Sequence, residues 1–364
     1  MRRARPARGP DTNGACRSRR SRFGGGAEQT VSAPRSGPFA LAFSSMLLND
    51  GNRAPTARSP SIAFATFAGH PEIQADDQPL ADALLRREAT IRAQVWDDPE
   101  VDWTAFDAIV LRSTWDYFVK AERFRDWLEA RDCEGTRVFN PVSAVRWNMD
   151  KRYLRDLEGR GVAIVPTHWV NHGERADLPT ILWDNGWDEA VVKPAISAAA
   201  HETWCATRER APDGTARLRA LAASGAVLVQ PFLREIERDG EWSLLFFGGR
   251  YSHAARKRPR AGDFRVQSQF GGIYSAEEPP KVAIDAARWA INTALELTGL
   301  TPLELPYARV DGCIVNGRFL LMELEIIEPT LFLAQSPVAA ARCAASILDA
   351  LAVENADTGH ATRG

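Results

Sequence analysis

The sequence lacks long apolar runs and has few residues of the kinds that build metal or redox centres. No stretch among its 364 residues approaches the roughly 18 apolar residues that a membrane span needs. Its five cysteines show no CxxC motif and no Cys/His spacing, which argues against a zinc site and against a disulfide framework. We therefore expect a cytoplasmic protein that does not span a membrane.

Two common nucleotide-binding motifs are also missing. The chain has no GxxxxGK[ST] sequence, so it is not a P-loop protein, and no GxGxxG sequence that would support dinucleotide binding. The net charge is −2, but residues 1–60 carry eleven Arg against three acidic residues, which leaves −10 for the remainder. An acidic body lacks the clustered Lys and Arg of a nucleic-acid groove, so we expect no nucleic-acid partner.

Residues 1–60 are rich in Arg, Pro, Ser and Gly and show neither helical nor strand periodicity. This composition predicts a disordered extension. We expect it to have no role in the fold, and Met46 is then a candidate for the true initiator. Two alternatives stay open: a basic tail that binds nucleic acid or membrane, and an export signal built on Arg19-Arg20.

Residues 61–140 predict a small parallel sheet. Apolar strands are expected near 61–67, 91–95 and 107–112, with helices after the first and the third. Strands that alternate with helices form parallel sheets, and ligands bind such sheets at the carboxyl ends of the strands. Any ligand site in this part of the chain is therefore expected just after residue 111.

Two further units follow. Residues 141–232 predict a helix at 149–161 and two apolar strands that end near 194 and 230. Residues 233–355 predict antiparallel hairpins, and the last of these turns at Asn316-Gly317, a strong hairpin signal. The predicted fold class is α/β (α+β), with a small parallel-sheet lobe followed by two α+β lobes.

Three carboxylates mark the last predicted hairpin. Glu323 and Glu325 are two residues apart on a strand and point to the same face, while Asp311 ends the preceding strand. Carboxylates that converge repel one another unless a cation lies between them, and oxygen ligands without His or Cys select Mg²⁺ or Mn²⁺. The apolar residues around them indicate a mostly buried strand, which strengthens the case for a metal site until it equals that for the alternative, a solvated hairpin face.

Two lysines and a strand exit suggest contacts with a nucleotide. Lys151 opens a predicted helix, and Lys193 ends an apolar strand, where a point charge can meet a phosphate. Gln230 and Phe232 end another apolar strand and can offer backbone groups to an adenine edge. Taken singly, each lysine can equally be a surface charge and the strand exit can be an ordinary one.

A basic, glycine-containing loop predicts an anion site. Lys257 precedes it, Arg265 lies within it, and Gly271 and Gly272 close it. Consecutive glycines expose backbone N–H groups, and Arg adds bidentate recognition of anions. The loop can therefore hold a transferring phosphoryl group or an acyl phosphate; a purely structural loop is the alternative.

The segment after the third strand suggests a substrate site. It places Arg112, Ser113, Trp115 and Asp116 within five residues and so combines a cation, a hydroxyl, an aromatic plane and a carboxylate. This set suits an amino-acid-like substrate that bears both charges. A strand end with a capping Ser or Asp is the alternative.

In this order, the motifs resemble those of the ATP-grasp superfamily over roughly residues 60–350. The motifs that carry the resemblance are Asn148 to Lys151 for Asn-x-x-Lys, Val191 to Pro194 for Val-x-Lys-Pro, Gln230 to Phe232 for the hinge, the loop from Lys257 to Gly272, and Asp311 with Glu323-Leu324-Glu325. The loop is similar to that of glutathione-synthetase-like and ribosomal-protein-modifying glutamate ligases. Glu325 departs from the family, which usually has Asn at this position. Among subfamilies, the chain is most similar to the cyclo-ligase of the cycloserine pathway and its uncharacterised relatives.

The resemblance implies a pre-ATP-grasp domain over 61–140, a central lobe over 141–232 and a C-terminal lobe over 233–355, with ATP between the last two. It implies that Lys151 and Lys193 contact the phosphates, that Gln230 lies beside adenine, and that Arg265 and the Gly271-Gly272 loop meet the transferred phosphate.

The activity that the resemblance implies is an ATP- and Mg²⁺-dependent ligase. ATP phosphorylates a carboxylate of a small amino-acid-like substrate, and an amine-type nucleophile then displaces phosphate. The expected partners are small-molecule carboxylate and amine substrates, and a homodimer is one assembly open to the protein. Two other functions stay open: an ATP-binding regulatory or scaffold protein without turnover, and a kinase that stops at the phosphorylated small molecule.

Overall fold

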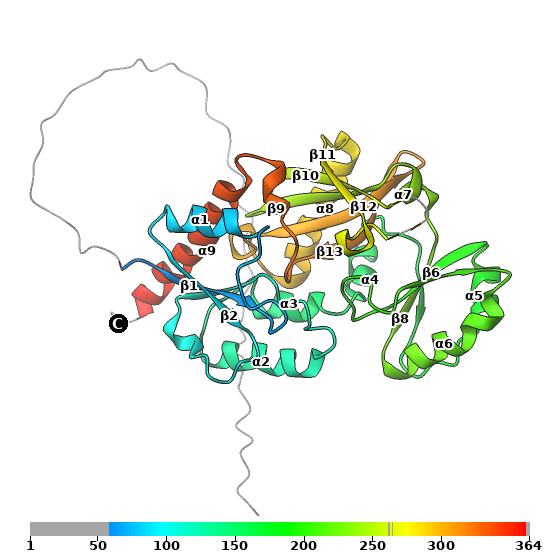
Figure 1. Ribbon diagram of the computed structural model, residues 1–364, viewed down its shortest axis with the longest axis horizontal. Coiled ribbons are helices and arrows are strands. Elements are labelled where there is room, and N and C mark those ends of the chain that lie inside the picture. The colour runs from blue at the N-terminus through cyan, green and yellow to red at the C-terminus, as the bar shows by residue number, and fades with distance from the viewer. Residues whose placement is uncertain (1–57, 261–262, 264, 362–364) are drawn as a thin grey trace, which may run out of the picture. The chain divides into compact units, whose positions relative to one another are not determined.

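The computed structural model describes residues 58–260, 263 and 265–361 (Figure 1). The disorder predicted for residues 1–60 therefore falls, apart from the last three residues, outside the described part of the chain. Contacts group the chain from Ser59 onward into one unit, which contains three sheets. Within the described residues, no helix is long and apolar enough to cross a membrane.

The first sheet is parallel, as the sequence predicts, and its strands lie in the order β2-β1-β3-β4. Its elements are β1 (Ser61–Thr66), α1 (Gln78–Leu85), β2 (Thr90–Val95), β3 (Ala108–Leu111), α2 (Ala121–Cys133) and β4 (Val138–Phe139). The central strands β1 and β3 are buried almost throughout because both faces of the sheet are covered. The carboxyl ends of β1 and β3 therefore meet at one edge.

The second sheet is antiparallel and has the order β5-β8-β6-β7. Its elements are β5 (His168–Val170), α5 (Leu178–Asp184), β6 (Glu189–Pro194), β7 (Trp204–Thr207), α6 (Ala211–Ser224) and β8 (Val227–Pro231). The sheet and its two helices bury a core of their own, which includes Val170, Leu182 and Leu218. Strands β5 and β7 were not predicted, because strands of three and four residues are too short to show a periodicity.

The third sheet is antiparallel and has the order β11-β10-β9-β12-β13. Its elements are α7 (Arg234–Arg238), β9 (Glu241–Phe247), β10 (Arg250–Arg258), β11 (Ile273–Ala276), α8 (Lys281–Thr298), β12 (Ala308–Val315) and β13 (Arg318–Glu325). The predicted hairpin turn is present: Asn316 and Gly317 both have positive φ, as a tight turn between twisted strands requires. The turn pairs Gly312 with Leu321, and a register shift between Gly312 and Asp311 then places Asp311 opposite Glu323 rather than Met322.

The helix predicted over 149–161 is wrong at its start. The structure has two short helices instead, α3 (Val142–Asn148) and α4 (Tyr153–Glu158). The side chain of Asp150 accepts a hydrogen bond from the backbone N–H of Arg152 at 2.9 Å, and the N–H of Lys151 donates to the carbonyl of Ala195 at 2.9 Å. These bonds divert the backbone from helical pairing and bring Lys151 against the second sheet.

Helix α9 (Ala339–Ala361) joins the first sheet to the third, as its position between them in Figure 1 shows. Its buried residues Cys343 and Ile347 share one apolar cluster with Phe64 of β1, Leu84 of α1 and Leu245 of β9. Helix α3 also places Val142 in the cluster of the first sheet, and α4 places Leu154 in a cluster with α8, the third sheet and Leu228 of β8. The division into domains at residues 140 and 232 stays a prediction.

Replacement of Ile347 by Ala should lower the free energy of unfolding by about 2–5 kcal/mol, because it leaves an empty space in the apolar cluster that joins the first sheet to the third. Urea denaturation measures this. As a control, Val282→Ala removes a 41% exposed side chain on α8 and should change the free energy by less than about 0.5 kcal/mol. Equal effects of the two variants would contradict the role of α9.

Candidate active site

A cavity of about 640 Å³ lies among residues of the second and third sheets and of the loops that follow β1 and β3. Ten of the residues predicted from the sequence line it: Trp115, Lys151, Lys193, Gln230, Phe232, Lys257, Arg265, Asp311, Glu323 and Glu325. The other five predicted residues, Arg112, Ser113, Asp116, Gly271 and Gly272, are not part of its lining.

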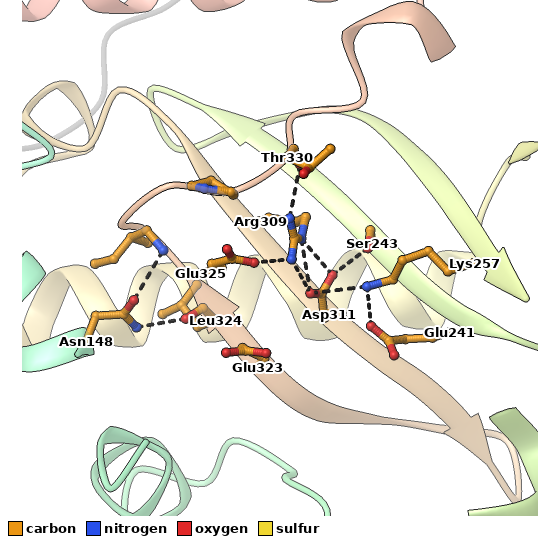
Figure 2. Close-up of polar contacts among 12 residues, drawn as sticks. Asn148, Glu241, Ser243, Lys257, Arg309, Asp311, Glu323, Leu324, Glu325 and Thr330 are labelled. Atoms are coloured by element: carbon orange, nitrogen blue, oxygen red, sulfur yellow. Dashed lines mark hydrogen bonds and ion pairs between the residues drawn. The ribbon is translucent and has the colours of Figure 1, made fainter. Parts of the chain in front are cut away.

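The centre of the site is a buried network around Asp311 on β12 (Figure 2). Arg309 lies two residues earlier on the same face of the strand, and its Nε donates to the two carboxylate oxygens at 3.1 and 3.0 Å. Ser243 of β9 donates a further hydrogen bond to Oδ1. Burial alone would raise the pKa of Asp311, but the charges of Arg309 and Lys257 outweigh it and lower that pKa to about 2. Asp311 is therefore an anion at neutral pH.

Lys257 belongs to the same network. It lies opposite Glu241 in the β9–β10 register, and its Nζ pairs with that carboxylate and lies 3.4 Å from Oδ2 of Asp311. Burial would lower the pKa of Lys257, but the charges of Asp311 and Glu241 raise it above its usual value. The lysine thus remains a cation whose observed partners are two carboxylates, and its predicted contact with a phosphoryl group stays a prediction.

Glu323 faces two lysines that come from distant parts of the chain. Nζ of Lys151 lies 3.1 Å from Oε1 of Glu323 and also donates to the carbonyl of Ser197. Lys193, at the end of β6, lines the cavity nearby, and burial lowers its pKa to about 8, although the charge of Glu323 partly offsets this. The structure therefore brings together the two lysines and the Asp311–Glu323 pair that the sequence predicted separately.

Glu325 and Glu328 form an acidic end of the cavity. Arg309 donates to Glu325, yet burial still raises the pKa of Glu325 to about 7. Glu328 is only 3% exposed, and burial together with the charge of Glu325 raises its pKa well above the usual range. Arg309 and Glu328 were not predicted from the sequence. Arg309 lies two residues before Asp311, and this spacing places both side chains on one face of the strand. Glu328 lies beyond the end of β13, where the alternation of strand faces no longer applies.

The backbone after β13 is irregular, but buried side chains hold its carbonyl groups. The donors, with their distances, are Asn140 Nδ2 to Ile326 at 2.6 Å, Tyr307 Oη to Ile327 at 3.2 Å, Arg112 to Pro329 at 2.8 Å, Arg309 to Thr330 at 3.1 Å, and His253 Nε2, which lies 3.0 Å from the carbonyl of Leu331. Buried carbonyl groups without partners are unfavourable, so these donors fix the path of residues 326–331. This segment carries Glu328 into the cavity wall.

Arg112, Ser113 and Asp116 are placed differently from the substrate role that the sequence suggested. The guanidinium of Arg112 is 2% exposed, and its Nε and Nη2 donate to Oδ1 of Asp77 at 2.9 and 2.7 Å. Asp116 accepts from Trp96 Nε1 at 2.7 Å and pairs with Lys120 at 2.6 Å. These charges are satisfied within the protein. Of the predicted group, Trp115 alone reaches the cavity, where it packs edge-on against His70.

The glycines of the basic loop shape the loop rather than line the cavity. Gly271 has a φ of +83°, and a Cβ on Gly272 would lie 1.9 Å from the carbonyl oxygen of Val266. Within the described residues of the loop, Arg265 faces the cavity, pairs with Asp263 at 2.8 Å and stacks 3.7 Å over the ring of Phe270. Gly262 and Phe264, which belong to the predicted anion site, lie outside the described residues.

Comparison with known proteins places this geometry in a family. Residues 62–140 match the family of the D-cycloserine synthetase DcsG N-terminal domain. The cycloserine biosynthesis protein DcsG of Streptomyces lavendulae is 33% identical over 299 residues, which cover 80% of this chain and 98% of that protein. The chain belongs to the DcsG family. The DcsG family consists of ATP-grasp ligases, so the ligase predicted from the sequence is confirmed.

Solved structures agree with this assignment of the DcsG-family ligase. The crystal structure of D-cycloserine synthetase DcsG superposes with a TM-score of 0.74 at 31% identity, over 80% of this chain and 99% of that one. D-alanine–D-alanine ligase from Bacillus anthracis gives a TM-score of 0.59 over 82% of this chain and all of that one. At 14% identity, the second comparison shows the shared fold alone.

Replacement of Asp77 by Ala should lower the free energy of unfolding by about 3–5 kcal/mol, because it leaves the buried guanidinium of Arg112 without its carboxylate. Chemical denaturation measures the loss. The control Glu122→Ala breaks an exposed pair with Arg125 and should cost less than about 1 kcal/mol. A small effect at Asp77 would show that Arg112 is available for other contacts.

Proposed function

We propose that this ligase uses ATP and Mg²⁺ to activate the carboxylate of a small amino-acid-like substrate as an acyl phosphate, which an amine or a related nitrogen nucleophile then attacks. One observation carries the proposal: two lysines face two in-register carboxylates within one cavity. Cations that bind phosphate and carboxylates that bind Mg²⁺ are the two elements that phosphoryl transfer needs. The similarity to D-cycloserine synthetase supports an amino-acid-like substrate.

The second sheet and the turn between α3 and α4 supply the proposed nucleotide contacts. Lys151 and Lys193 would bind the phosphates, since both ammonium groups face the acidic strand of the third sheet. Gln230 and Phe232 line the same cavity at the end of β8, where we place the adenine. The side chain of Gln230 donates to Thr167 at 2.9 Å and is thereby oriented, which leaves the strand backbone to meet the base.

Asp311 and Glu323 fit the proposed metal. Their donor atoms are oxygens only, they are directly opposite each other on β12 and β13, and both have lowered pKa values that keep them ionised. No three acidic, His or Cys side chains among the described residues form a ready metal cluster. Arg309 pairs with Asp311 and with Glu325, the third predicted ligand, so metal binding by either carboxylate requires that guanidinium to turn away. When bound, Mg²⁺ would neutralise the phosphate charges and polarise the transferring group.

The remaining residues would position the reactants. Arg265 faces the cavity from the basic loop and can stabilise charge on the transferring phosphoryl group. Trp115 and His70 offer flat walls at the carboxyl edge of the parallel sheet, where we place the organic acid. Lys257 would remain a cation, and its charge would help to keep the carboxyl group of Asp311 ionised.

Substrate-dependent release of ADP tests the proposal. The purified protein is mixed with Mg-ATP and a panel of amino acids, their derivatives and small carboxylates, and products are identified by mass spectrometry. Release of ADP and phosphate with a new C–N bond supports the ligase. Binding of ATP without turnover in any mixture would indicate a regulatory protein, and ADP release with a phosphorylated small molecule as the end product would indicate a kinase.

Glu323→Gln and Asp311→Asn should each lower turnover by at least about 100-fold, because each removes a charge that holds the metal. Thermal melts with and without Mg-ATP should show a reduced stabilisation by nucleotide. Glu122→Gln, an exposed position on α2, is the matched control and should retain both properties. If the Glu323 and Asp311 variants also retain both, the metal site is assigned to the wrong residues.

Nucleotide affinity should depend on pH through Lys193. Its pKa of about 8 in the ligand-free protein leaves the ammonium charged below pH 8, so affinity should fall by up to about tenfold per unit as the pH rises above that value. Titration calorimetry with a non-hydrolysable ATP analogue measures the profile. Lys193→Arg stays charged and should give a flat profile; the same fall in that variant would exclude Lys193 as its cause.

A further inference from the structure

We propose that Glu328 binds the cationic amino group of the substrate and so makes the ligase selective for acids that carry an ammonium. This inference rests on the proposed function for the place of the substrate, but not on any turnover. Glu328 lies in the cavity wall and is 3% exposed, and no described residue donates a hydrogen bond to its Oε2. It is thus a buried acceptor that faces the cavity without a partner.

The cations already present do not satisfy Glu328. The charge of Arg309 lowers the pKa of Glu328, but the donors of Arg309 are directed to Asp311, Glu325 and the carbonyl of Thr330. No ion pair of Glu328 occurs among the described residues. An ionised carboxylate that is buried without a partner is unfavourable, so Glu328 favours the protonated form until a ligand delivers a cation that can pair with it.

The charges around Glu328 favour a cation. Glu325 and Glu323 both raise the pKa of Glu328, which shows that this end of the cavity has a negative potential. Burial and the same carboxylates raise the pKa of Tyr117, so its hydroxyl group in the cavity wall stays neutral. An ammonium group would therefore meet an acceptor, Oε2 of Glu328, that no described residue occupies, and pairing with it would favour the ionised form of Glu328.

The backbone on both sides of Glu328 is held in place. Tyr307 donates to the carbonyl of Ile327, and the buried Arg112 donates to that of Pro329. A group fixed in this way needs no ordering when the ligand binds, which strengthens binding and makes it selective. Arg112, expected from the sequence to touch substrate, thus acts as a positioning residue for Glu328.

The test compares ligands that differ by one amino group. D-Alanine, L-alanine and D-cycloserine are titrated into the protein with Mg²⁺ and a non-hydrolysable ATP analogue, and propionate and isoxazolidin-3-one serve as the deaminated partners. We expect the wild-type protein to bind at least one amine about 10- to 100-fold more tightly than its deaminated partner. Glu328→Gln should remove most of this difference, while Glu122→Gln should retain it.

Two further measurements separate this role from others. The variant Glu328→Gln should bind the ATP analogue and Mg²⁺ as the wild type does; a selective loss of Mg²⁺ binding would show that Glu328 is a metal ligand and would overturn the proposal. If Glu328→Gln does not fold, the wild-type comparison decides alone: equal binding of amines and deaminated partners, or no binding of any amine, refutes the proposal. Because no step requires turnover, a failed ligase assay leaves this result interpretable.

Discussion

The need to compensate the buried negative charge of Asp311 organises the site. A carboxylate that is 2% exposed needs cations and donors around it, and Arg309, Lys257 and Ser243 supply them from three adjacent strands. These partners fix the register at which β9, β10 and β12 must pair. The same compensation makes Asp311 an anion that is available for a metal ion, so the stability of the third sheet and the chemistry of the site depend on one set of contacts.

The conformation of the segment after β13 is fixed by hydrogen bonds that side chains donate to its backbone carbonyl groups. Residues 326–331 form no strand or helix, and side chains from the first and third sheets donate to them. Arg112 and Asn140 come from the parallel-sheet unit, more than 180 residues away in sequence. The wall of the cavity therefore forms only when the first and third sheets have packed, and α9 buries the apolar surface that holds them together.

The site residues that could be predicted from the sequence are charged residues within an apolar strand or at its end. Lys193 ends an apolar strand, and Glu323 lies in one, so their exposure at a cavity follows from the pattern. Arg112 has the same local pattern, but its partner Asp77 lies 35 residues earlier and no periodicity relates the two. Glu328 was missed because its strand ends at Glu325, and past a strand end the alternation of faces no longer tells which way a side chain points.

The separate core of the second sheet has a mechanical consequence. Among the described residues, its main apolar cluster is distinct from the cluster around α9, although Leu228 of β8 lies in the cluster of the third sheet, α4 and α8. Displacement of β5 to β8 as a body would therefore expose the surface around Leu228 but leave the cluster around α9 intact, whereas displacement of the first sheet would break that cluster. Strand β6 with Lys193 is thus the lysine-bearing part that can move relative to the carboxylates. Lys151, which lies between α3 and α4, bonds both to Glu323 and to the carbonyl of Ser197 after β6, and so ties the end of β6 to the carboxylates.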